Sequence, residues 1–97
     1  MEALIVPQIF KIGEYLIYFW INENDPLEPI HVHVARGKPA KNATKIWLTL
    51  AGGCLLQNNR SAIPERQLRI IMQVVSARHA EIAAKWLETF GEIRYYC

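Results

Sequence analysis

Two histidines separated by a single residue, His31 and His33, are the part of this sequence best suited to chemistry. On a β-strand, residues two apart point to the same side, which would place the two imidazoles about 6–7 Å apart. Because imidazole titrates near neutral pH, one histidine as general base and the other as general acid could act on the 2′-hydroxyl of RNA. Arg36 or Lys38, which follow the pair, could stabilise the charge that develops on the phosphate.

The same pair allows interpretations without this chemistry. Two imidazoles on one strand can hold a metal ion, but a metal site needs a third and a fourth ligand. No second cluster of histidine or cysteine supplies them at a recognisable spacing. We therefore predict no metal and no cofactor, and a metal-dependent hydrolase stays open as an alternative. The two histidines can also serve binding or structure alone.

The segments around the pair have the composition of β-strands. Residues 30–36 and 43–50 alternate apolar and polar side chains with a period of two, as a strand with one buried face does. Residues 8–22 resemble a hairpin, whose second half is rich in aromatic and β-branched residues. The predicted strands are residues 8–12, 15–21, 30–36, 43–50, 54–57 and 92–96.

After Pro64 the apolar period changes to that of a helix. Apolar residues recur at i, i+3, i+4 and i+7 over about six turns. Pro64 suits the first helical position and Gly91 suits the C-terminal cap. The pattern predicts one long helix over residues 65–90, which can bend near residues 76–78. Its predicted buried side consists of Leu68, Ile71, Met72, Val75, Ile82, Trp86 and Phe90.

A single helix can cover only one face of a small sheet. The sequence therefore predicts one two-layer α+β domain over residues 1–97, a small and mainly antiparallel sheet with one long helix packed on one face. Ile30, Val32 and Val34 fit the covered side, so His31 and His33 would lie on the other side, which we call the helix-free face. This face is expected to be open to solvent unless a homodimer partner or a loop covers it. It would collect Tyr18, Trp20, His31, His33, Lys45 and Trp47.

The formal net charge of +2 hides an uneven distribution. Residues 1–28 contain five acids and one base, whereas residues 29–64 contain five Lys and Arg residues and no acid. Such a split suggests a positive surface that faces a negative partner, although a solvated basic loop is the simpler interpretation. No apolar run approaches the roughly 18 residues of a membrane span. The two cysteines show no metal or disulfide spacing, and we expect a cytoplasmic location.

A set of short motifs spread over the chain points to a known family. The motifs are Ile9-Phe10-Lys11-Ile12-Gly13, Pro29-Ile30-His31-Val32-His33-Val34, Gly37-Lys38, Ala43-Thr44-Lys45-Ile46-Trp47-Leu48, Ile63-Pro64-Glu65, Trp86 and Phe90-Gly91-Glu92. Together they resemble the small bacterial family called domain of unknown function 4160. The resemblance covers essentially the whole chain and implies a stand-alone cytoplasmic protein. In that family, the gene often lies beside a small gene whose product resembles an antitoxin or DNA-binding protein, which implies a toxin–antitoxin-like module.

The leading hypothesis is a toxin-like component of such a module that engages RNA through the helix-free face, beside a cognate antitoxin-like protein. The alternative is a non-enzymatic protein-binding module, whose partner docks on that face or adds a strand to the sheet edge. In the RNA hypothesis the central pair is His31 and His33, phosphate is held by Arg36, Lys38 and Lys45, and bases stack on Tyr18, Trp20 and Trp47.

Overall fold

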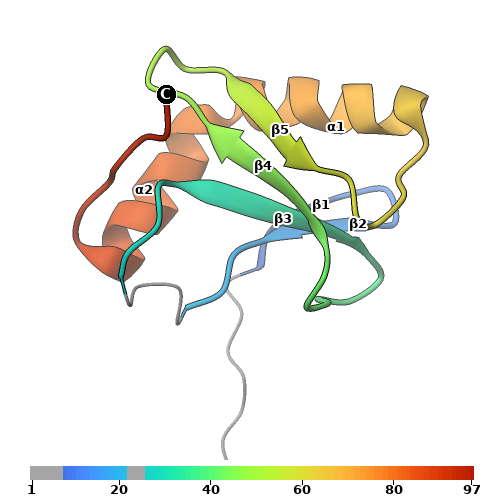
Figure 1. The fold of residues 1–97 in the computed structure, drawn as a ribbon, viewed down its shortest axis with the longest axis horizontal. Helices are drawn as coiled ribbons and strands as arrows, with labels where there is room; N and C mark the ends of the chain where they lie inside the picture. Colours follow the sequence, from blue (N-terminus) through green and yellow to red (C-terminus); the bar gives the residue numbers. More distant parts are fainter. Residues whose placement is uncertain (1–7, 22–25) are drawn as a thin grey trace, which may run out of the picture.

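The computed structural model of the chain describes residues 8–21 and 26–97 (Figure 1). Its strands form one sheet in the order β1-β2-β3-β4-β5, and each neighbouring pair is antiparallel. This arrangement confirms the predicted α+β class with an antiparallel sheet. The elements are β1 (Gln8–Ile12), β2 (Tyr15–Tyr18), β3 (His31–Arg36), β4 (Thr44–Leu48), β5 (Cys54–Asn58), α1 (Glu65–Ala77) and α2 (His79–Phe90).

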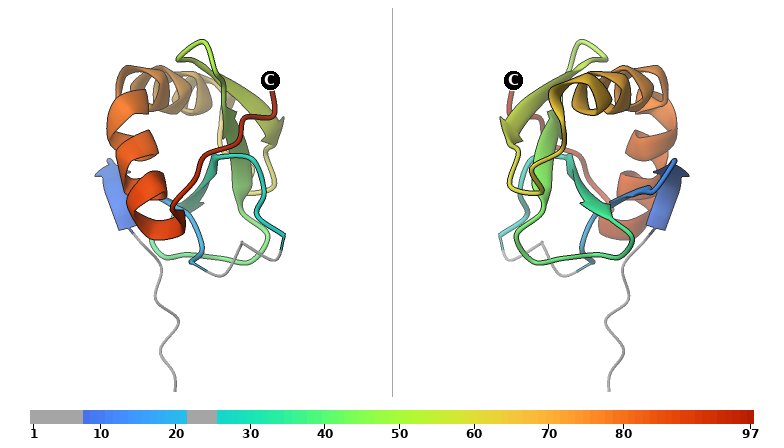
Figure 2. Two further views of the ribbon diagram at one scale, coloured as in Figure 1. Left: turned by 90° about the vertical axis from the view of Figure 1, so that its left-hand side faces the viewer. Right: turned by 90° about the vertical axis from the view of Figure 1, so that its right-hand side faces the viewer.

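The helical segment differs from the prediction of one long helix, because it breaks into α1 and α2 at Arg78. Arg78 has φ −107° and ψ 24°, and the two helices run in different directions from it (Figures 1 and 2). A straight helix over residues 65–90 would be about 39 Å long, about twice the length of strands of five or six residues. The break lets both halves pack on the same small sheet, and Gly91, at φ 80°, ends α2 in the left-handed conformation.

The predicted final strand over residues 92–96 is wrong, because this segment forms no strand. It nevertheless returns along the sheet after α2 (Figure 2). The backbone N–H of Ile30 donates to the carbonyl of Arg94 at 2.8 Å, and that of Leu50 donates to Cys97 at 2.9 Å. These two bonds join the C-terminal segment to the chain at the start of β3 and just after β4.

The main core lies between the sheet and the two helices. Ile30, Val32 and Val34 are fully buried there, as the alternation predicted. Ile21 and Leu50, the last residues of the predicted strands 15–21 and 43–50, are exposed because β2 ends at Tyr18 and β4 ends at Leu48. The apolar side chains that the helical pattern predicted to be buried do pack into this core. Met72 and Phe90 are partly buried, and the remaining ones are buried: Leu68, Ile71, Val75, Ile82 and Trp86.

A smaller apolar cluster lies on the helix-free face, and the loop between β3 and β4 covers part of it. The cluster contains Leu16, Tyr18, Ala35 and Ala43, with Trp20 packed against it. The Tyr18 hydroxyl donates to the carbonyl of Ala40 at 2.9 Å and accepts from the Ala40 N–H at 3.0 Å. The interpretation that a loop folds over this face is therefore correct for this part of it.

Within the described residues, neither helix has the length and apolar character needed to cross a membrane.

Candidate functional site

A polar cavity of about 280 Å³ opens on the helix-free face and brings together side chains from three strands and from the segments that flank them. We call it the basic cavity. β3, β4 and β5 supply its floor, and the rest comes from the segments that flank these strands. It is lined by Trp20, Glu28, His33, Lys41, Ala43, Lys45, Gln57, Asn58 and Arg60.

The strand register explains why these side chains meet. His33 of β3 is opposite Lys45 of β4, and Lys45 is opposite Asn58 of β5. Directly opposed residues in antiparallel strands point to the same face of the sheet, so an imidazole, an ammonium and an amide form one row across three strands. An irregularity in the β4–β5 pairing begins at this row, between Lys45 and Ile46.

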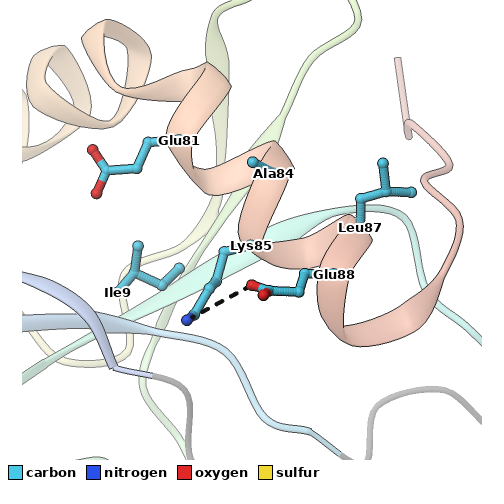
Figure 3. Close-up of a pocket in the computed structure, with 6 residues that line it drawn as sticks. All are labelled: Ile9, Glu81, Ala84, Lys85, Leu87 and Glu88. Carbon is cyan, nitrogen blue, oxygen red and sulfur yellow. Dashed lines mark ion pairs between the residues drawn. The ribbon is translucent and has the colours of Figure 1, made fainter.

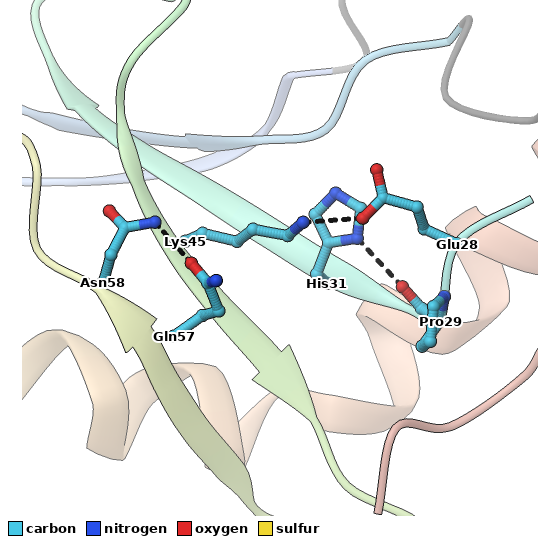
Figure 4. A network of polar contacts seen from close by, with 6 residues as sticks. All are labelled: Glu28, Pro29, His31, Lys45, Gln57 and Asn58. Carbon is cyan, nitrogen blue, oxygen red and sulfur yellow. Dashed lines mark hydrogen bonds and ion pairs between the residues drawn. The ribbon is translucent and has the colours of Figure 1, made fainter.

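Charge in the basic cavity is unbalanced. Its described lining has three cations, Lys41, Lys45 and Arg60, against one carboxylate, Glu28. The Lys45 Nζ lies 2.6 Å from the Glu28 Oε1 (Figure 4), and it also lies 4.5 Å from the centre of the Trp47 ring. The Lys45 side chain is 17% exposed and that of Glu28 is 40% exposed. The pair therefore sits at the wall of the cavity with the carboxylate nearer to solvent.

The two histidines lie close together, but neither faces open solvent. The expectation that they lie on a solvent-exposed face of the sheet is therefore wrong. Their ring centres are 5.0 Å apart, and His31 is fully buried whereas His33 is 8% exposed. Strand alternation fixes the direction of a side chain but not what later segments place over it. His31 contacts the Trp47 ring, which Tyr96 of the C-terminal segment covers by stacking at 4.8 Å. His33 packs against Tyr18 and reaches the basic cavity.

The hydrogen bond of His31 fixes its tautomer. Its Nδ1 lies 2.9 Å from the carbonyl oxygen of Pro29 (Figure 4). Since a carbonyl only accepts, Nδ1 carries the hydrogen and donates it. The Trp86 ring of α2 lies 5.3 Å from the same imidazole. His31 thus ties the segment that precedes β3 to the strand itself.

Among the other predicted residues, the structure brings Lys45 and Trp20 into the basic cavity and leaves Arg36 outside it. Arg36 lies at the far end of β3, where its Nη2 donates to the Tyr15 hydroxyl at 2.8 Å and its Nε lies 3.4 Å from Glu14. The hydrogen bond to Tyr15, and then the charge of Glu14, raise the pKa of the Arg36 guanidinium above its ordinary value.

The remaining predicted residues do not line the basic cavity. Tyr18 is buried beneath the β3–β4 loop and Lys38 is exposed on that loop. Trp47 is half-buried and stacked on Tyr96.

Sequence reasoning missed five polar residues of the cavity lining. Lys41 and Arg60 belong to the acid-free, base-rich stretch of residues 29–64, which is the signal that could have found them. Gln57 and Asn58 carry no such signal, because only the pairing of β5 with β4 brings them to Lys45. Glu28 gives no signal either, since it ends the acidic N-terminal stretch rather than belonging to the basic one.

Within residues 8–21 and 26–97, no group of three or more His, Cys, Asp or Glu side chains is placed to hold a metal ion.

A larger concavity of about 710 Å³ lies beside α2, where Ile9 of β1 faces the helix (Figure 3). Its charged side chains have partners nearby. The Lys85 Nζ is 4.0 Å from Glu88, and Glu81 accepts from Arg78 at 2.8 Å. Among its described residues this concavity offers no imidazole, and its lining has two carboxylates against one ammonium rather than a surplus of positive charge, so the basic cavity is the stronger candidate site.

The model of the family described as Domain of unknown function (DUF4160) matches residues 14–87. This span contains every residue that lines the basic cavity. No curated protein and no solved structure matches the chain significantly.

Proposed function

The chain belongs to the family described as Domain of unknown function (DUF4160), and we propose that it binds RNA through the basic cavity as the toxin-like component of a two-gene module. The observation that carries the proposal is the convergence of Lys41, Lys45 and Arg60 on one polar cavity whose described lining has a single carboxylate. The surplus of positive charge suits the phosphates of a nucleic acid backbone, which supply most of the affinity in such complexes.

The uncharged lining also suits a nucleotide. Trp20 offers a ring on which a base can stack, a contact worth about 1–3 kcal/mol per base. The amides of Gln57 and Asn58 offer both donors and acceptors to the edge of a base. Lys38 is exposed on the same loop as Lys41, and in this proposal the two hold the backbone where it leaves the cavity.

The proposed partner is an antitoxin-like protein encoded beside this gene. In a two-gene module of this kind, binding of the partner would block access of RNA to the basic cavity. Growth inhibition by the protein alone, and its relief by the neighbouring gene product, are the expected behaviour in cells.

RNA binding can be tested by fluorescence anisotropy with a labelled single-stranded oligoribonucleotide at several salt concentrations. For single strands, log affinity falls against log salt with a slope of about −0.7 per phosphate contact. Lys41→Ala and Arg60→Ala should each weaken binding and make the slope shallower by about 0.7. Lys85→Ala removes the same charge from α2, outside the cavity, and should leave both unchanged. Absence of RNA binding at low salt, or equal effects of all three variants, would overturn the proposal.

Protein docking is the second candidate function, and an exposed apolar patch favours it. Leu50, Leu55 and Tyr96 are 73%, 44% and 60% exposed. Leu55 is opposite Trp47 in the β4–β5 register, and Trp47 stacks on Tyr96. Exposed apolar patches mark interaction surfaces. Docking on this patch would depend weakly on salt, which separates it from phosphate binding.

A further inference from the structure

Two cations of the basic cavity, Lys41 and Arg60, form no ion pair with any residue that the structure describes. The third cation, Lys45, is paired with Glu28, the one carboxylate of the described lining (Figure 4). We propose that this cavity receives an end of the RNA strand and binds the terminal phosphate, a phosphomonoester, through Lys41 and Arg60. The inference rests on the RNA binding proposed above and names the part of the RNA that the cavity recognises.

The charge of the basic cavity matches a terminal phosphate better than an internal one. Because the Lys45–Glu28 pair contributes no net charge, three cations against one carboxylate leave the two positive charges of Lys41 and Arg60. A phosphodiester within a strand carries a single negative charge, whereas a phosphomonoester carries about −1.5 to −2 at neutral pH. A phosphate at the end of a strand therefore compensates both cations, and a phosphate within the strand leaves one of them uncompensated.

Hydrogen bonds fix the backbone on both sides of Arg60. The hydroxyl of Thr44, a fully buried residue, donates to the Asn59 Oδ1 at 2.7 Å and accepts from the Ser61 N–H at 3.1 Å. The Arg60 N–H itself donates to the Asn58 Oδ1 at 2.9 Å. These bonds hold the turn that follows β5 against the start of β4, so the backbone that carries the guanidinium is fixed beside the cavity.

The backbone next to Lys41 is anchored as well. Lys41 follows Ala40, whose N–H and carbonyl both form hydrogen bonds with the Tyr18 hydroxyl, at 3.0 and 2.9 Å. Tyr18 is fully buried, which ties the β3–β4 loop to the sheet at this point. The side chains of Lys41 and Arg60 are exposed and can turn toward a phosphate, while the backbone below them is already in place. Such preorganisation lowers the entropy that binding costs.

The size of the basic cavity also favours a strand end. Its volume of about 280 Å³ lies just below the range of about 300–1,000 Å³ that is typical of small-molecule pockets. This space suits one nucleotide better than a strand that enters and leaves. In the proposed arrangement the base of the terminal nucleotide lies against Trp20, and the rest of the strand leaves past Lys38 on the β3–β4 loop.

The test compares oligoribonucleotides of one sequence that carry a 5′-phosphate, a 3′-phosphate or hydroxyls at both ends, with a fluorophore on an internal base. Anisotropy at one salt concentration gives their dissociation constants. A phosphorylated strand should bind at least about tenfold more tightly than the hydroxyl strand, as expected for hydrogen bonds to a charged group. A gain at the 5′ end, at the 3′ end or at both supports the inference and identifies the end that the cavity holds. A methyl ester on the terminal phosphate removes one charge and should remove most of the gain.

Variants show whether the gain arises in the cavity. Lys41→Gln and Arg60→Gln should each reduce the preference for the phosphorylated strand several-fold. Lys38→Gln is the matched control, because Lys38 is exposed on the same loop as Lys41 but does not line the cavity. It should weaken the binding of all strands equally and leave the preference unchanged.

Three results would show that the inference is wrong while RNA binding stands. Phosphorylated and hydroxyl strands could bind equally, the methyl ester could keep the full gain, or Lys38→Gln could reduce the preference as much as Arg60→Gln. If no strand binds even at low salt, the proposed function itself fails.

Discussion

Replacing His31 by alanine is expected to lower the free energy of unfolding by about 3 kcal/mol. The imidazole is fully buried and packs edge-on against the rings of Trp47 and Trp86. Truncating a buried side chain of this size costs about 2 kcal/mol or more. Loss of the bond from Nδ1 to the Pro29 carbonyl adds about 1 kcal/mol. Truncating a histidine on the surface would lower the free energy of unfolding by less than about 0.5 kcal/mol. The experiment therefore distinguishes a buried imidazole from an exposed one.

Thermal unfolding followed by circular dichroism measures this effect. For a domain of this size, each kcal/mol lowers the melting temperature by about 4–8 °C, so His31→Ala should melt at least about 12 °C below wild type. Lys38→Ala, on the exposed β3–β4 loop, provides the surface control and should melt within about 3 °C of wild type. Equal melting temperatures for the two variants would refute the burial of His31 and its role in holding the segment that carries Glu28.

Three further predictions concern stability and reactivity. Trp86→Ala should cost about 3–5 kcal/mol in urea unfolding, because the ring is fully buried against Phe19, and an unchanged midpoint would contradict this. Tyr18→Phe should cost about 1–2 kcal/mol and weaken RNA binding by releasing the β3–β4 loop, whereas unaltered RNA affinity would separate the loop from the site. Burial raises the pKa of the Cys54 thiol, so at mildly alkaline pH iodoacetamide should modify it more slowly than exposed Cys97 in the native protein, and unfolding should equalise the two rates.

The same pKa shift has a consequence for stability. Because burial raises the pKa of Cys54 in the folded state, the unfolded chain releases the thiol proton at lower pH. The stability that the protonated thiol contributes is fully present below the ordinary thiol pKa of the unfolded chain. It is lost as pH rises through the raised pKa that the thiol has in the folded protein. Cys54→Ala should remove this alkaline decline, which urea unfolding at a series of pH values measures. An identical decline in the variant would show that another group causes it.

Features that depend on neighbours in the sequence could be predicted. Alternation places Val32 and Val34 in the core because each residue on a strand takes the opposite side from the one before it. The helical period places Leu68 and Trp86 correctly even though the helix breaks between them, because both halves turn their apolar side to the same sheet. The break at Arg78 interrupts the backbone but not the pattern, so the pattern predicts one helix that can bend near residues 76–78 and not two separate helices.

Features that depend on distant segments could not be predicted. His31 is covered by Trp86 of α2 and by Trp47 of β4, on which Tyr96 of the C-terminal segment stacks. The basic cavity requires Arg60, which reaches His33 and Lys45 only because β5 pairs with β4. A sequence pattern records residue types and spacing, and it does not record which loop folds over which strand. The sequence could therefore predict which face of the sheet carries the candidate site and that the site is positively charged. It could not predict the full set of residues that line it.

The three tryptophans allow the most direct test of the claim that the basic cavity binds RNA. Trp20 lines the cavity, Trp47 lies in the apolar patch, and Trp86 is in the core. In uniformly ¹⁵N-labelled protein, each indole N–H gives its own NMR signal, which single Trp→Phe variants of Trp20 and Trp47 assign. Titration with a single-stranded oligoribonucleotide at low salt should move the Trp20 signal most and leave that of Trp86 in place. A titration that moves only Trp47, or none of the three signals, would contradict the account.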